Sequence, residues 1–100
     1  MVEVKININK KETNSFDIYD EDGKVGGMIF DIIMNDLTVY HTEINPIKEG
    51  KGYARQLLDA MVDYVRKHHL KVIPLCPYLH NQFSRNEVMY NDIWNKINEV

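Results

Sequence analysis

A short glycine-containing segment has the residue types of an anion-binding loop. It reads Glu49-Gly50-Lys51-Gly52-Tyr53-Ala54-Arg55 and lies between an expected strand and an expected helix. Unpaired N–H groups and the helix dipole favour an anion at such a helix start. The segment is not a Rossmann G-x-G-x-x-G, which would place glycine at Arg55, nor a Walker G-x-x-x-x-G-K-S/T. Two interpretations remain open: a phosphate site, or glycines that only let the chain turn.

Cys76 is the only cysteine, and it stands directly before Pro77. The proline favours extended backbone at Cys76 and suits the first turn of a helix, so Cys76 is expected at an N-cap position. A helix N-terminus favours the thiolate, which makes Cys76 a candidate nucleophile or proton donor. The alternative is a small buried apolar residue.

His41 and Glu43 are two residues apart in an expected strand and therefore share one face. Either can act as a general base, directly or through water. The alternative is that this face is only solvated. Tyr78 and Tyr90 are further candidate acids, or else packing residues.

The first half of the chain predicts four antiparallel strands, because polar and apolar residues alternate there. The strands are expected at about 2–8, 15–20, 25–34 and 37–44. Turns are expected at 21–24 and 35–36, and Gly26-Gly27 is expected to mark a bulge.

After Pro46 the apolar spacing becomes helical and predicts a long helix from about Gly52 to His68. A strand at 70–75 would then pair in parallel with 37–44, with a ligand crevice at the carboxyl ends of both strands. Short helices are expected at 78–84 and about 87–97, the last docked by Tyr90, Ile93, Trp94 and Ile97. The predicted class is α/β: a mixed, mostly antiparallel five-strand sheet with one long helix and short C-terminal helices.

The length, composition and charge of the chain argue against several classes of function. One hundred residues predict a single domain, 1–100. A net charge of -3 and a pI near 5.7 argue against a nucleic-acid binder. No apolar run is long enough to span a membrane, and the lone cysteine and the missing signal peptide predict a cytoplasmic protein. His68, His69 and His80 lack ligand spacing, so no metal is predicted.

The segment Ile44-Asn45-Pro46 followed by Glu49 to Ala54 resembles the pattern V-x-P-x-x-R-G-x-G-x-G/A of the GNAT N-acetyltransferases, with the same spacing. His41 to Ile44, the loop, and the run LKVIPLCPY at 70–78 further resemble a subfamily of very small GNAT-like proteins with a C-P-Y motif. This similarity covers about residues 25 to 95.

The resemblance implies a GNAT-like fold that binds acetyl-CoA and transfers acetyl to a primary amine of a small molecule or protein. The pyrophosphate would lie on the amides of 50–55, and the pantetheine between strands 37–44 and 70–75. The implied cofactor-binding residues are Ile44, Gly50, Lys51, Gly52, Tyr53, Ala54, Arg55, Cys76 and Tyr78. The implied catalytic residues are Cys76, Glu43 and His41.

The sequence departs from the family pattern in three places. Glu49 stands where the motif opens with Arg or Gln, and a residue near Phe83 replaces a tyrosine that many members use as an acid. A few polar residues join the first two strands, where the family has two helices. A non-catalytic acyl-CoA-binding sensor or adaptor is therefore a second hypothesis. A thiol redox protein is a third, although the chain has no resolving cysteine. A monomer or weak homodimer is expected.

Overall fold

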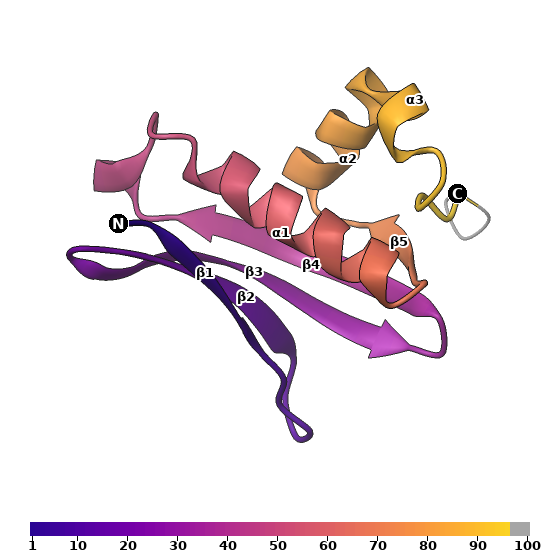
Figure 1. The fold of residues 1–100 in the computed structure, drawn as a ribbon, viewed down its shortest axis with the longest axis horizontal. Coiled ribbons are helices and arrows are strands. Elements are labelled where there is room, and N and C mark those ends of the chain that lie inside the picture. The colour runs from indigo at the N-terminus through magenta and orange to yellow at the C-terminus, as the bar shows by residue number, and fades with distance from the viewer. Residues whose placement is uncertain (97–100) are drawn as a thin grey trace.

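The computed structural model describes residues 1–96 and has one five-stranded sheet with α1 lying across one face (Figure 1). The strands are β1 (Glu3–Asn7), β2 (Asn14–Asp20), β3 (Gly23–Ile33), β4 (Asp36–Ile44) and β5 (Lys71–Pro74), in the order β1-β2-β3-β4-β5. Neighbours from β1 to β4 are antiparallel, and β4 and β5 are parallel. The predicted mixed α/β sheet is confirmed.

The helices are η1 (Pro46–Lys48), α1 (Tyr53–Lys67), α2 (Pro77–Arg85) and α3 (Glu87–Tyr90). The long helix α1 begins and ends within one residue of the predicted bounds. It buries the apolar face that its spacing indicated, formed by Leu57, Leu58, Met61, Val62 and Val65. These side chains pack on buried residues of β2, β3 and β4, and the same core also includes buried residues of β5, α2 and α3 and residues 93–94.

The predicted helix over 87–97 is wrong beyond Tyr90, where α3 ends. Trp94 instead forms a parallel bridge with Val72, and Asn95 donates its N–H to the Val72 carbonyl at 2.9 Å. The outer edge of β5 supplies these hydrogen bonds, and a longer helix would leave its backbone groups unpaired. The docking residues Tyr90, Ile93 and Trp94 are buried as predicted, and Ile97 lies outside the described residues.

The predicted bulge at Gly26-Gly27 is displaced by one residue, because the register between β2 and β3 makes Val25 the extra residue. Gly26 has a different role. A Cβ atom at Gly26 would lie 2.6 Å from both the Glu43 carbonyl oxygen and the Ile44 Cδ1 atom. Glycine at this position therefore lets β3 and β4 approach each other closely.

A second bulge lies in β4, where Tyr40 is the extra residue between the pairs formed by Val39 and His41. The ladder between β4 and β5 ends immediately before it, at Val39 and Pro74. From His41 to Ile44, β4 pairs with β3 and with no other described strand. The two parallel strands thus part at the bulge, and we call the space between residues 40–44 of β4 and Cys76 the strand gap.

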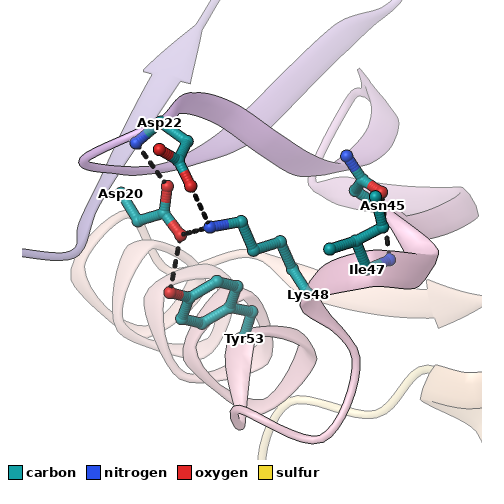
Figure 2. A network of polar contacts seen from close by, with 6 residues as sticks. All are labelled: Asp20, Asp22, Asn45, Ile47, Lys48 and Tyr53. Atoms are coloured by element: carbon teal, nitrogen blue, oxygen red, sulfur yellow. Dashed lines mark hydrogen bonds and ion pairs between the residues drawn. The ribbon is translucent and has the colours of Figure 1, made fainter.

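A buried carboxylate connects the turn after β2 to the start of α1 (Figure 2). The Asp20 side chain is 1% exposed, accepts a hydrogen bond from the Tyr53 hydroxyl at 2.8 Å and pairs with Lys48 Nζ at 2.9 Å. Asp22 also pairs with Lys48, and its N–H donates to the Asp20 carboxylate at 2.8 Å. Three segments that are distant in sequence are held together by this network.

The ionisation of these groups reflects the pairing. The hydrogen bond from Lys48 lowers the pKa of Asp20 from 3.8 to about 2, assisted by Asp22 and Tyr53 and opposed by burial. Hydrogen bonds to Asp22 and Asp20 raise the pKa of Lys48. The hydrogen bond to Asp20 likewise raises the pKa of Tyr53, so its hydroxyl remains a donor.

We predict that Asp20→Asn destabilises the fold more than Asp22→Asn, because Asp20 is buried and the Asp22 side chain is 66% exposed. The folded-state pKa of Asp20 lies below its unfolded value, so its carboxylate stabilises the fold above about pH 4. This stabilisation is lost as the pH falls from about 4 towards 2. Urea unfolding across that range should therefore show the gap between wild type and Asp20→Asn closing, and a gap that stays constant would contradict the assignment.

Candidate functional site

The loop before α1 contains two glycines in the left-handed conformation. Gly50 has φ +82° and Gly52, the N-cap of α1, has φ +80°. A Cβ atom at either would contact nothing within 4 Å, so backbone conformation rather than space requires glycine here. Gly52 provides no side-chain cap to the helix. The amides that open α1 therefore point to the loop without the side-chain acceptor that many helices have.

A pocket of about 220 Å³ lies at this helix start. It brings together seven of the nine predicted cofactor-binding residues, from β4, the loop, α1 and α2. Its lining is Ile44, Lys48, Glu49, Gly50, Gly52, Tyr53, Ala54, Arg55 and Tyr78. Lys51 and Cys76 are the two predicted residues that do not line it.

The cationic side chains near this pocket differ in how strongly carboxylates of the protein already bind them. Lys48 is held by two carboxylates, and Arg55 Nε pairs with Asp59 at 3.1 Å in an exposed pair of the kind that contributes little stability. Lys51 is exposed and has no ion pair with any residue from 1 to 96. Lys51 and Arg55 are thus the cations with freedom to meet an anion.

The strand gap presents backbone groups of β4. The N–H of Asn45 donates to the Val25 carbonyl of β3 at 2.8 Å. Because backbone direction alternates along a strand, the N–H and C=O groups of Thr42 and Ile44 point away from β3, towards the gap. The backbone N–H groups that follow β5 do not bond to these groups of β4, because those of Leu75 and Cys76 both donate to the Val39 carbonyl at 3.1 Å.

Cys76 is the N-cap of α2, as predicted, with extended backbone at φ -67° and ψ 125°. Its side chain is buried, and Sγ donates to Thr42 Oγ1 at 3.3 Å across the strand gap. Tyr78 follows two residues later and is half-buried. Burial raises the pKa of Tyr78, which Arg55 partly opposes, so the hydroxyl keeps its proton.

His41 and Glu43 share a face of β4, and His41 Nε2 lies 2.8 Å from Glu43 Oε1. Their side chains are 57% and 75% exposed. Both line a pocket of about 580 Å³ with Gly27, Ile29 and Thr42, among others. Side chains alternate between the two faces of β4, so those of His41 and Glu43 lie on the face opposite to that of Thr42. The structure therefore does not bring His41 and Glu43 together with Cys76.

Sequence reasoning missed Asp20, Lys48 and Thr42. Asp20 and Tyr53 are 33 residues apart, a separation that produces no local periodicity. Asp20, Glu21 and Asp22 lie close enough together to hold a metal ion, but the Lys48 ammonium already contacts two of them. The absence of a metal site stays a prediction. Within residues 1–96, no helix combines the length and the apolar character needed to cross a membrane.

Nineteen chains of solved structures match this one, among them the three that follow. A GCN5-like protein from Staphylococcus aureus is 24% identical, with a TM-score of 0.68 over 95% of this chain and 91% of its own. A ribosomal-protein-alanine N-acetyltransferase from Brucella melitensis biovar Abortus is 13% identical, with a TM-score of 0.70 over 85% and 90%. The ribosomal-protein-S18-alanine N-acetyltransferase from Escherichia coli is 15% identical, with a TM-score of 0.60 over 66% of this chain and 43% of its own.

The chain therefore spans less than half the length of the Escherichia coli enzyme. No curated protein matches the sequence. The family model of the GCN5-related N-acetyltransferases matches residues 15–93, a range that includes the glycine loop, the strand gap and Cys76. That match confirms the family predicted from the motif, while the C-P-Y subfamily stays a prediction. The chain belongs to the GCN5-related N-acetyltransferases.

Proposed function

We propose that the protein binds acetyl-CoA and transfers its acetyl group to a primary amine of a small molecule or protein. Acetyl-CoA is the cosubstrate of GNAT acetyltransferases, the family to which the chain belongs. The observation that carries the proposal is the position of the pocket at the start of α1. It shares Ile44 with the strand gap, so an anionic group and an extended chain can bind as one ligand.

The pyrophosphate of CoA is proposed to lie on the amides of residues 50–55, with Lys51 and Arg55 beside it. Glu49 opposes this binding, but its side chain is exposed and water reduces the repulsion. The pantetheine would run along the strand gap and bond to the backbone of Thr42 and Ile44, as an added strand would. The thioester would then lie near Thr42 and Cys76.

Acetyl transfer needs a base, an acid and a hydrogen-bond donor to the thioester carbonyl. The amine nitrogen attacks the thioester carbon, and Glu43 or His41 takes the proton that the nitrogen loses. A backbone N–H of β4 near Ile44 that faces the strand gap would stabilise the developing oxyanion. When the C–S bond breaks, Cys76 or Tyr78 returns a proton to the CoA thiolate. The acceptor is proposed to enter from the face that holds His41 and Glu43, through the pocket of about 580 Å³.

A second candidate function is a non-catalytic acyl-CoA-binding module. It is favoured by the connection between β1 and β2, which consists only of residues 8–13 and adds no helix over the acceptor face. The high exposure of His41 and Glu43 agrees with this alternative. Both functions share the same cofactor site, so binding and turnover must be measured separately.

We predict that Lys51→Glu weakens CoA binding by about tenfold, because a carboxylate would then face the pyrophosphate. Acetyl-pantetheine lacks the phosphates and should bind wild type and variant equally. Calorimetry with both ligands measures this. Lys11→Glu, the same charge change in the exposed connection between β1 and β2, is the matched control. Equal loss for both ligands, or for both variants, would count against a pyrophosphate site at the loop.

We predict turnover of acetyl-CoA in the presence of primary amines, measured as released thiol. Glu43→Gln should reduce kcat by about a hundredfold or more if Glu43 is the base, because general bases contribute that much. The affinity for CoA should not change. Wild-type thiol release no faster than hydrolysis in buffer, across a broad amine panel and with CoA still bound, would favour the binding module.

We predict that Cys76 acts as an acid or packs against Thr42 rather than carrying the acetyl group, because its side chain is 2% exposed. Intact mass after incubation with acetyl-CoA should then show no added acetyl group. Wild type is measured beside Cys76→Ala. One acetyl group on wild type alone would show instead that Cys76 forms a covalent intermediate.

A further inference from the structure

The outer edge of β1 is unpaired. β1 is the terminal strand of the sheet, and no described residue forms a ladder with its far side. Its sequence, EVKIN, alternates charged or polar residues on one face with apolar residues on the other. Such an edge offers backbone N–H and C=O groups to another strand.

The apolar side of β1 is incompletely covered by α1. Ile6 is 40% exposed and Ile8 is 53% exposed. A groove of about 440 Å³ runs between β1 and α1, lined by Val4, Ile6, Phe16, Ala60, Asp63, Tyr64 and Lys67. Both an open backbone edge and an apolar surface thus lie at the same end of the sheet.

We propose that a second copy of the chain pairs with this edge, β1 antiparallel to β1, with the two-fold axis at Val4. In this register Glu3 lies opposite the partner's Lys5, and Lys5 lies opposite the partner's Glu3. Val2 lies opposite the partner's Ile6 on the other face. Each copy therefore meets opposite charge on one face and apolar side chains on the other.

Charge selects this register from its neighbours. An axis at Glu3 would set the two copies of Glu3 opposite each other, and an axis at Lys5 would do the same with the two lysines. Like charges directly opposite destabilise a strand pair. An axis at Ile6 would leave Lys5 opposite the partner's Asn7, with no opposite charge. Of these four two-fold registers, only the one at Val4 gives ion pairs.

The arrangement places α1 of both copies on the same side of a continuous sheet, since a two-fold axis perpendicular to the sheet keeps its faces. The grooves beside Ile6 then adjoin the partner's Val2. β1 has five residues, so the interface is small and the dimer should depend on concentration. The strand gap lies between β4 and β5, on the opposite side of the sheet from β1, and stays accessible.

Sedimentation equilibrium over a concentration series tests this proposal. Wild type should shift from monomer to dimer mass as concentration rises. Glu3→Lys should weaken the dimer by about tenfold or more, because each of two symmetric pairs becomes repulsive. Glu12→Lys makes the same charge change outside the paired residues and should leave the dimer unchanged. A wild type that stays monomeric throughout, or equal weakening by both variants, would overturn the proposal.

Two further measurements test the register itself. The double variant Glu3→Lys/Lys5→Glu exchanges the charges and should restore wild-type dimerisation. Lys5 pairs in register with Asp17 of β2, so the new carboxylate would lie beside Asp17 in the monomer. Salt therefore provides an independent readout. Added NaCl should weaken the wild-type dimer and strengthen that of Glu3→Lys. Salt effects of the same sign in both proteins would refute ion pairing between Glu3 and the partner's Lys5.

Discussion

The parting of β4 from β5 is the constraint on which the rest of the site depends. Pro74 ends β5 and has no N–H to continue a ladder, and Pro77 begins α2 two residues after Leu75. The Leu75 and Cys76 amides both turn to the Val39 carbonyl and close the parallel pairing there. β4 continues beyond this point, so on one side its backbone has no partner among residues 1–96.

The glycine loop must be held at the end of this gap, and the Asp20 network does so. Asp20 fixes Lys48 of η1 and Tyr53 of α1, the two residues that flank the loop. Gly50 and Gly52 supply the left-handed turns in between. The loop is therefore anchored at both ends while its own amides stay free of side-chain caps. Such fixed geometry reduces the conformational entropy that a ligand would have to overcome.

Local patterns predicted most of the elements, because alternation and helical spacing are properties of neighbouring residues. They placed α1 to within one residue and put His41 and Glu43 on one face. They failed where contacts between residues distant in sequence determine the structure. Trp94 joins the edge of β5 instead of extending a helix, and the partners of Asp20 lie in other segments. Met34 is apolar, yet it is 92% exposed at a turn with φ +56°.

Gly26 connects the close packing of β3 against β4 with the strand gap. Its missing side chain lets β3 lie against the Glu43 carbonyl and the Ile44 side chain, which belong to the segment of β4 that borders the strand gap. A single methyl group at Gly26 would push that segment sideways and alter the width of the gap from behind, without touching anything bound in it. Position 26 thus sets the spacing of a site to which it contributes no atom.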